Sequence, residues 1–323
     1  MTKVSPPGGA SNFDCFIPRM VLPSGDEVYR EEGLAMAEVR IAKDWKAYEL
    51  LMTGDGQKQE RWGDFILRRP EPQAVWPAEK PWEKADAVYH RSKSGGGHWE
   101  YIRKIPAKWQ ISYKQLKFNV EPTGFKHTGL FPEQAVNWDF SMEKINRAGR
   151  KTEILNLFAY TGGATVACAS AGASVCHVDA AKGMVARAKD NLALSGMRDK
   201  PVRFIVDDAI KFVKREIRRG RKYDGIIMDP SAYGRGPAGE LWKIEDTLYE
   251  LVELCAQLLG EDPLFFIINS YASALSPILM ENIMGLLLQN KLGGQIETFE
   301  LGLKITNSSM ILPCGFTGRL END

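Results

Sequence analysis

Residues 153–172 read Glu-Ile-Leu-Asn-Leu-Phe-Ala-Tyr-Thr-Gly-Gly-Ala-Thr-Val-Ala-Cys-Ala-Ser-Ala-Gly, and the rest of the chain is understood most simply as built around them. The apolar run at 154–158 is short and continuous, which is typical of a strand covered on both faces by helices. Gly162 and Gly163 predict a turn in which the backbone approaches a ligand without a Cβ in the way. The small residues at 164–171 then predict a helix that closes against the sheet.

The next strand supplies a second sign of a nucleotide cofactor. Residues 174–178 lead to Asp179, about twenty residues beyond the first strand, where a doubly wound fold places an acid on a ribose hydroxyl. A pyrophosphate needs closely spaced glycines, and residues 158–163 lack the Gly-x-Gly-x-x-Gly spacing. Dinucleotide binding is therefore disfavoured, whereas S-adenosylmethionine, which has a ribose and an adenine but no phosphate, suits this turn. An ordinary strand-turn-helix with incidental glycines is the alternative for the stretch taken alone.

The composition limits the class of protein. The chain has 323 residues, 44% of them hydrophobic, which is enough for one large α/β domain and a smaller unit. No apolar run approaches the roughly twenty residues of a membrane span, and the N-terminus lacks the order of a secretion signal, so a cytoplasmic location is expected. The five cysteines and four histidines show no ligand spacing, so we expect neither a disulfide scaffold nor a metal site.

Local basic surface says more about partners than the net charge of +1. Residues 211–222 are strongly basic, and residues 56–126 mix Lys and Arg with aromatic side chains such as Trp62, Tyr89 and Tyr101. A face of this kind could hold RNA through phosphate contacts and base stacking. The alternatives are a solvated helix end for the first stretch and the core of a small β domain for the second.

The first half of the chain predicts two segments. Residues 1–45 show no sustained periodicity before a short helix expected at 31–41, and we interpret them as an N-terminal extension. Residues 46–115 change to short strands punctuated by turns, which predicts a small β-rich domain for substrate recognition. The strands of this domain are expected at 48–52, 61–68, 87–91 and 99–104.

Residues 116–323 alternate strands and helices, which predicts an α/β, doubly wound, Rossmann-like domain that binds the cofactor. The last two strands, at 295–304 and 309–316, are joined by a short turn and must be antiparallel. A parallel sheet finished by an antiparallel hairpin is the methyltransferase form of this fold. A fully parallel six-stranded sheet would instead indicate a dehydrogenase.

Polar residues follow the ends of the expected strands, at the rim where open α/β sheets bind ligands. We expect Asp208, rather than Asp207, to accept a hydrogen bond from the adenine amino group, with Ala209 leaving room for the ring. Asn269 ends a later strand at the same rim. Either Asp207 or Asp208 could instead cap the helix at 209–219.

Residues 226–233 read Ile-Ile-Met-Asp-Pro-Ser-Ala-Tyr, an apolar strand that ends in Asp-Pro. This ending holds the Asp229 carboxylate at the sheet edge, Pro230 directs a carbonyl into the cleft, and Tyr233 supplies an aromatic face. The three together suit a planar amine whose lone pair must be aimed at a methyl donor. A plain strand-to-turn exit would also use Asp-Pro.

These motifs and the loop Gly-Phe-Lys-His-Thr-Gly-Leu-Phe at 124–131 occur together in one order. Over residues 48–320 the chain resembles the class I S-adenosylmethionine-dependent methyltransferases related to the bacterial enzymes that methylate large-subunit (23S) ribosomal RNA. In that family the Gly-x-Lys-x-Thr-Gly-like loop packs against the cofactor. The resemblance therefore implies cofactor contacts from Lys126, Thr128, Phe131 and Gln134, beside Phe158, Ala159 and Gly162 around the methionine portion.

The chain departs from this family pattern at one turn. Members that methylate C5 of cytosine carry a Ser-Cys-Ser-like turn after the fifth strand, because a thiolate must first add to C6. Here that turn, residues 269–274, has no cysteine, and Cys255 and Cys314 are expected to be buried. Transfer to a base nitrogen of RNA, with ribosomal RNA favoured, is therefore expected. A protein or small-molecule acceptor, a non-catalytic RNA-binding protein that keeps the cofactor fold, and a homodimer stay open.

Overall fold

The computed structural model describes residues 38–92, 96–124, 126–235 and 241–322, and the chain from Ala37 onward forms one compact unit. The predicted N-terminal extension lies outside the described residues up to residue 37. Its end forms strand β1 (Val39–Ile41), which pairs in parallel with β16 (Gln295–Lys304). The short helix expected to reach Ile41 is therefore wrong for these residues, because their backbone extends the edge of a sheet.

The large sheet confirms the predicted fold class. Its eight strands lie in the order β1-β16-β17-β15-β12-β9-β10-β11, and only β17 runs antiparallel to its neighbours. The strands not yet located are β9 (Glu153–Leu157), β10 (Ser174–Asp179), β11 (Val202–Val206), β12 (Gly225–Met228), β15 (Phe265–Ser270) and β17 (Ile311–Glu321). The strand order changes direction between β9 and β12, which is where open α/β sheets bind ligands.

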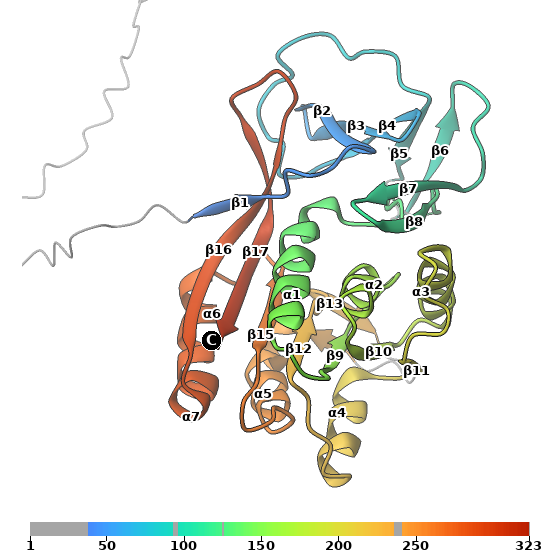
Figure 1. Ribbon diagram of the computed structural model, residues 1–323. Coiled ribbons are helices and arrows are strands. Elements are labelled where there is room, and N and C mark those ends of the chain that lie inside the picture. The colour runs from blue at the N-terminus through green and yellow to red at the C-terminus, as the bar shows by residue number, and fades with distance from the viewer. Residues whose placement is uncertain (1–37, 93–95, 125, 236–240, 323) are drawn as a thin grey trace, which may run out of the picture. The chain divides into compact units, whose positions relative to one another are not determined.

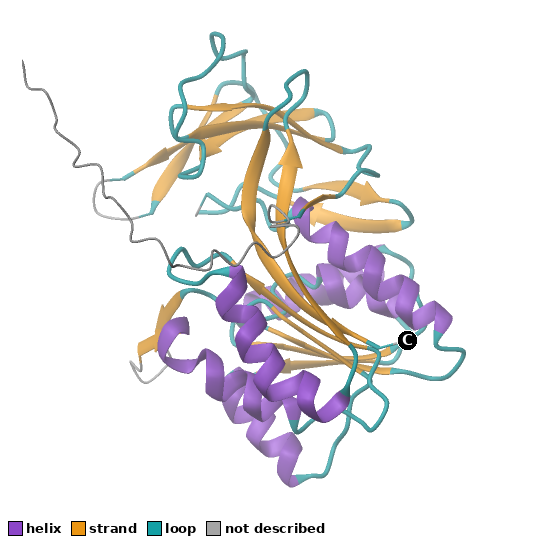
Figure 2. Cartoon of the chain, turned by 90° about the vertical axis from the view of Figure 1, so that its left-hand side faces the viewer, coloured by secondary structure: helices purple, strands orange, loops and turns teal. Residues whose placement is uncertain are grey.

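Helices cover both faces of this sheet (Figure 2). On one face lie α1 (Ala135–Arg147), α2 (Gly163–Ser170) and α3 (Lys182–Leu194). On the other lie α4 (Ala209–Arg218), α5 (Ile244–Ala256) and α6 (Pro277–Met284), the last continued by the π-helix η2 (Gly285–Gln289) and α7 (Asn290–Leu292). Residues of β9 alternate between two cores: Ile154 packs with the first set and Leu155 with the second.

The predicted β-rich segment forms a separate five-stranded sheet, labelled β2 to β6 in Figure 1. Its strands are β2 (Tyr48–Gly54), β3 (Gln57–Trp62), β4 (Phe65–Pro70), β5 (Ala87–Arg91) and β6 (Gly97–Tyr101). The single strand expected at 61–68 is wrong, because a turn at Gly63, which has φ 63°, folds β4 back along β3.

A hairpin follows this sheet, formed by β7 (Trp109–Tyr113) and β8 (Leu116–Val120). The predicted domain boundary after residue 115 falls in its turn, and the domain division stays a prediction. Trp62, Phe118 and Trp138 belong to one continuous buried core that extends from the small sheet to α1.

The tip of the β16–β17 hairpin also meets the small sheet. Ile305 bridges to Leu50 of β2, and the Thr306 amide donates to the Leu50 carbonyl at 2.9 Å. A two-stranded ribbon, β13 (Tyr233–Arg235) and β14 (Leu241–Lys243), was not predicted. No helix in the described ranges is long and apolar enough to cross a membrane.

Candidate functional site

Two adjoining cavities lie at the carboxyl ends of β9, β10, β12 and β15. The inner cavity, of about 60 Å³, is lined by strand-end residues and by α1, including Asn156, Gln134 and Asn269. The outer cavity, of about 770 Å³, extends to β3 and β4 of the small sheet. Both cavities are lined by Phe131, Phe158, Tyr160 and Asp229. The small sheet therefore contributes to the site that the large sheet begins.

The turn after β9 has an unusual backbone. Phe158 and Tyr160 have φ of 53° and 50°, a left-handed conformation that residues other than glycine rarely adopt. Surrounding hydrogen bonds hold it: the Ala159 amide donates to Val178 at 3.1 Å and the Tyr160 amide donates to Asp179 Oδ2 at 2.8 Å. Such over-determined strain is common where a turn presents groups to a ligand.

The two glycines of this turn have a packing role beside the predicted one. A Cβ on Gly162 would lie 2.8 Å from Ala188 Cβ, and a Cβ on Gly163 would lie 2.5 Å from Trp138 Cζ2. The space beside each is filled by α3 or α1, so helix packing also requires glycine here. Gly163 lines the inner cavity, whereas Gly162 lines neither.

Asp179 lies at the end of β10, as predicted, and lines the outer cavity. Its Oδ1 accepts from the Ala181 amide at 2.8 Å, so each carboxylate oxygen receives one backbone N–H. Each oxygen keeps a second lone pair for a ligand hydroxyl. Burial raises the pKa of Asp179 above its usual value, although the hydrogen bonds from the Ala181 and Tyr160 amides act to lower it.

Asp208 acts as a helix cap in the structure. Its side chain accepts from the Lys211 amide at 2.8 Å at the start of α4, and the Asp207 carboxylate pairs with Arg215. Ala209 is buried in the core. Neither Asp208 nor Ala209 lines a cavity, so their contact with adenine stays a prediction.

The 124–131 loop brings some of its predicted residues to the site. Lys126 lines the outer cavity, where burial lowers the pKa of its ammonium group, and Phe131 lines both cavities. Gln134 lines the inner cavity and donates to the Tyr271 hydroxyl at 2.7 Å. Thr128 of this loop is fully buried and lines neither cavity.

Asp229 follows β12 and lies where the two cavities meet. Burial, and secondarily the charge of Glu133, raises the pKa of Asp229 to about 7. Pro230 lines the outer cavity beside it. Tyr233 is 55% exposed on β13 and lines neither cavity, so the structure does not bring it together with Asp229.

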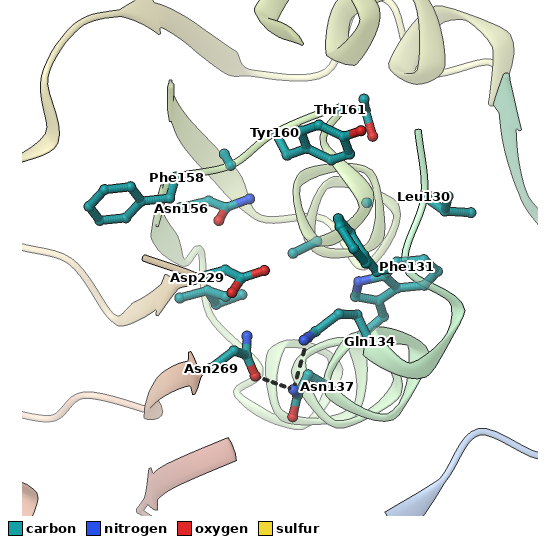
Figure 3. Close-up of a pocket in the computed structure, with 15 residues that line it drawn as sticks. Leu130, Phe131, Gln134, Asn137, Asn156, Phe158, Tyr160, Thr161, Asp229 and Asn269 are labelled. Carbon is teal, nitrogen blue, oxygen red and sulfur yellow. Dashed lines mark hydrogen bonds between the residues drawn. The ribbon is translucent and has the colours of Figure 1, made fainter. Parts of the chain in front are cut away.

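Two residues of the inner cavity, Asn156 and Asn137, were not singled out by sequence reasoning. Figure 3 shows Asn156, Asp229 and Asn269 on one side of the inner cavity and Phe131 with Gln134 on the other. Asn137 links the two sides, since its Nδ2 donates to Asn269 Oδ1 at 2.9 Å and to Gln134 Oε1 at 3.1 Å. The sequence did contain a signal for Asn156, because it is the one polar residue within the apolar run at 154–158.

Asn156 belongs to a short buried chain of hydrogen bonds. Its Nδ2 donates to Thr165 Oγ1 at 2.9 Å, and Thr165 Oγ1 lies 2.9 Å from His177 Nδ1. Burial lowers the pKa of His177 to about 3, so its ring is neutral at pH 7. A neutral ring can accept at Nδ1, which fixes the Thr165 hydroxyl and through it the Asn156 amide.

Buried ion pairs form the wall that the small sheet contributes. Arg69 Nε lies 2.6 Å from Glu60 Oε2, and Lys58 Nζ lies 2.9 Å from Glu71 Oε2. Burial opposes the charge of Glu60, but the charges of Arg69 and Lys58 lower the pKa of Glu60 to about 2. Arg69 also donates to the Lys126 carbonyl at 3.1 Å, which ties the 124–131 loop to β4.

The basic stretch at 211–222 is not beside the cavities. It occupies α4, which leaves the carboxyl edge of the sheet and ends far from β2 to β6 in Figure 1. Three of its cations are paired within the chain: Lys214 with Glu250 at 2.8 Å, Arg219 with Glu216 at 2.8 Å, and Arg221 with Glu153 at 2.6 Å. That this stretch joins the small sheet in one RNA platform stays a prediction.

The aromatic residues of the small sheet are also mostly internal. Trp62 and Tyr89 are buried, and Tyr101 is exposed. The core interpretation therefore holds for Trp62 and Tyr89.

Comparison with known proteins decides the family. Residues 41–282 match the family described as S-adenosylmethionine-dependent methyltransferase. The chain belongs to this family. The crystal structure of a SAM-dependent methyltransferase from Agrobacterium tumefaciens is 33% identical, with a TM-score of 0.84, and the match covers 88% of this chain and 93% of that one. A putative SAM-dependent methyltransferase from Streptococcus mutans shares the fold, with 18% identity and a TM-score of 0.65 over 87% of this chain and 76% of that one.

The matches to curated relatives cover shorter parts of this chain. Ribosomal RNA large subunit methyltransferase K/L of Shewanella baltica is 34% identical over 118 residues, which are 36% of this chain and 16% of that protein. Ribosomal RNA large subunit methyltransferase K of Neisseria meningitidis is 25% identical over 233 residues, which are 68% of this chain and 64% of that protein. This chain thus spans about a sixth of the first of these relatives.

The site fits the family's cofactor, S-adenosylmethionine. The outer cavity lies within the roughly 300–1,000 Å³ usual for small-molecule sites. Its lining offers a cation at Lys126 and a carboxylate at Asp179, which match the carboxylate and the ribose diol of the cofactor. Within the described ranges, no group of three or more His, Cys, Asp or Glu side chains could hold a metal ion.

Proposed function

We propose that this family member transfers a methyl group to a base nitrogen of RNA, with ribosomal RNA favoured. The observation that carries the proposal is the position of Asp229, which ends β12 at the junction of the two cavities. The names of the curated relatives support an RNA acceptor. A protein or small-molecule acceptor, and RNA binding without catalysis, are the competing functions.

For the cofactor, we assign Asp179 to the ribose hydroxyls and Asp208, with Ala209, to the adenine. Phe158, Ala159 and Gly162 surround the methionine portion, together with the loop residues Lys126, Thr128, Phe131 and Gln134. The cavity lining supports Asp179, Phe158, Ala159, Lys126, Phe131 and Gln134 most directly. When bound, S-adenosylmethionine supplies an electrophilic methyl group on a sulfonium.

For the acceptor, Asp229 and the Pro230 carbonyl accept hydrogen bonds from a ring or exocyclic N–H and so orient the nitrogen lone pair. Asp229 also takes the proton that the nitrogen loses, which requires its carboxylate form. The stacking role of Tyr233 stays a prediction, because Tyr233 is exposed on β13 and lines neither cavity. Tyr271 is a further aromatic group at this position, because it lines the outer cavity beside Asp229.

The environment of the cysteines bears on whether the methyl group goes to a nitrogen or to a carbon of the base. Cys255 is fully buried, but Cys314 is only partly buried and lines the outer cavity, which the sequence did not predict. Burial raises the pKa of Cys314 well above its usual value, and its thiol lies 3.5 Å from the Leu312 carbonyl as a donor. A thiol held in this way is a poor nucleophile at pH 7.

Cys314→Ser and Cys255→Ser are therefore expected to retain methyl transfer within about threefold of the unaltered protein, well short of the 100-fold or larger loss caused by removing a reacting group. Initial rates with labelled donor would check this, with circular dichroism as the folding control. A folded but inactive Cys314→Ser protein, or a covalent complex with RNA that contains 5-fluorocytosine, would return the carbon mechanism.

RNA binding should depend steeply on salt. Phosphate contacts release counterions, so the logarithm of the affinity for large-subunit ribosomal RNA should fall linearly with the logarithm of the salt concentration. Fluorescence anisotropy at several salt concentrations would measure the slope. Absence of affinity at low salt would favour a protein or small-molecule acceptor, and binding without methyl transfer would favour the non-catalytic function.

Three coarser expectations accompany this proposal. Residues 46–115 are proposed to recognise the substrate and residues 116–323 to bind the cofactor, with a cytoplasmic location. A homodimer stays a prediction that sedimentation would test.

A further inference from the structure

Glu133 is a second carboxyl group in the wall of the outer cavity. It lies in the 3₁₀-turn η1 (Pro132–Gln134), immediately before α1, and only 5% of it is exposed. Its Oε1 accepts from the Tyr271 hydroxyl at 3.1 Å, and that hydroxyl accepts from Gln134 Nε2 at 2.7 Å. Gln134 thus fixes the Tyr271 hydroxyl, and the Tyr271 hydroxyl fixes the Glu133 carboxyl.

Asp229 lines the same cavity, and neither acid has a cation as a close partner. Lys58 of β3 and Arg69 of β4 face this space, but they are engaged by Glu71 at 2.9 Å and by Glu60 at 2.6 Å. In the part of the chain that the structure describes, no Lys or Arg lies within ion-pair distance of Glu133 or Asp229. Tyr271 after β15 and Cys314 in β17 also face this space, and both are neutral at pH 7. The other titratable groups are Tyr48 of β2, which the charge of Glu133 reaches, and Lys126, His127, Tyr160 and Asp179 in the wall of the same cavity.

A carboxylate in the wall of the same cavity disfavours the charged form of a second carboxyl group and so raises the pKa of the second. Tyr271 faces both acids: it donates to Glu133, and both carboxyl groups raise the pKa of its hydroxyl. Burial raises the pKa of Glu133, as it does that of Asp229. Burial and the charge of Glu133 therefore both disfavour the carboxylate form of Asp229.

We propose that Glu133 is a positioning residue whose carboxylate charge sets the pH at which Asp229 can receive a proton from the methyl acceptor. This inference rests on the proposed role of Asp229. It adds a residue that touches neither reacting atom and acts through the charge of its carboxyl group. In a protein whose residue 133 carries no charge, Asp229 should be able to receive a proton from the methyl acceptor at lower pH.

The test uses the full chain without cofactor or acceptor. Aspartate labelled with ¹³C at the carboxyl carbon would give the Asp229 titration midpoint by NMR, with Asp229→Asn to assign the signal. Glu133→Gln should lower this midpoint by about one pH unit or more, because it removes a like charge. Glu133→Asp, which keeps the charge, should leave the midpoint within a few tenths of a unit.

Glu143→Gln is the matched control, because Glu143 is an exposed acid on α1 that lines neither cavity. An unchanged Asp229 midpoint in Glu133→Gln would overturn the proposal, as would an equal change in Glu133→Gln and Glu133→Asp. In the loaded enzyme the acid limb of kcat/KM should move to lower pH in Glu133→Gln alone. Since the NMR titration needs no acceptor, its result is independent of whether RNA proves to be the substrate.

Discussion

Asp229→Ala is expected to abolish methyl transfer while S-adenosylmethionine binding stays nearly intact. The Asp229 side chain lies at the junction of the two cavities, whereas the groups assigned to the ribose and the methionine portion lie elsewhere on the lining. Loss of a proton acceptor in the transition state costs about 100- to 10,000-fold in rate. Initial rates with labelled donor and calorimetry with S-adenosylhomocysteine would measure the two quantities.

Asp229→Asn keeps the shape of the side chain and should lose a similar factor, because an amide cannot take the proton. Asp199→Asn is the control, since Asp199 is an exposed acid away from the site. If Asp229→Asn retained most of the activity, or if it lost cofactor binding together with activity, Asp229 would not be the acceptor group.

The same substitution has an expected effect on stability that needs no substrate. The pKa of Asp229 is about 7 in the native protein and about 3.8 when exposed, so between these values the native state holds a proton that the unfolded state has released. The free energy of unfolding therefore falls as the pH rises from about 4 to 7. Asp229→Asn should remove this fall, which thermal unfolding at pH 5 and pH 8 would detect.

Asp179→Asn is expected to weaken S-adenosylmethionine binding by about 1.5–3 kcal/mol, through loss of a charge-assisted hydrogen bond to the ribose. The structure adds a second effect. Both carboxylate oxygens of Asp179 accept backbone N–H groups, from Tyr160 and from Ala181. The side-chain amide of asparagine would turn its NH₂ group toward one of these backbone N–H groups, so the turn that carries Phe158 should also be destabilised. Calorimetry and thermal unfolding without ligand would separate these effects.

Asp208→Asn is the matched variant for the adenine end of the site. Asparagine caps helices as well as aspartate, so the start of α4 should keep its stability. Our assignment predicts weaker cofactor binding at an unchanged melting temperature. Unchanged binding would leave Asp208 as a helix cap alone.

The polarity pattern was sufficient to predict the central strands of the large sheet, because each is a short apolar run and β10, β12 and β15 lead to a polar rim residue. The edge strand β1 was missed, because its residues were expected in a helix. Asp179 and Asp229 lie at the strand ends where this reasoning placed them. The glycine turn was located correctly, but the packing that also requires glycine there was not predicted. A sequence does not show that Ala188 and Trp138 fill the space beside Gly162 and Gly163.

Other features depend on contacts between distant residues. Glu133 and Tyr271 are separated by 138 positions and meet because η1 packs beside the end of β15. Likewise, Lys214 and Arg221 read as a free basic surface until their partners Glu250 and Glu153 are known. Charge in a sequence predicts an interaction surface only when the tertiary partners of that charge are also known.

The central claim is transfer of a methyl group to a base nitrogen of RNA. The most direct measurement incubates ribosomal RNA from cells that lack this gene with the protein and deuterated-methyl S-adenosylmethionine, digests the RNA to nucleosides and identifies the labelled nucleoside by mass spectrometry. We predict one labelled nucleoside methylated on nitrogen, absent with the Asp229→Ala protein. Label in 5-methylcytidine, or label found only in protein or small molecules of the extract, would contradict the account.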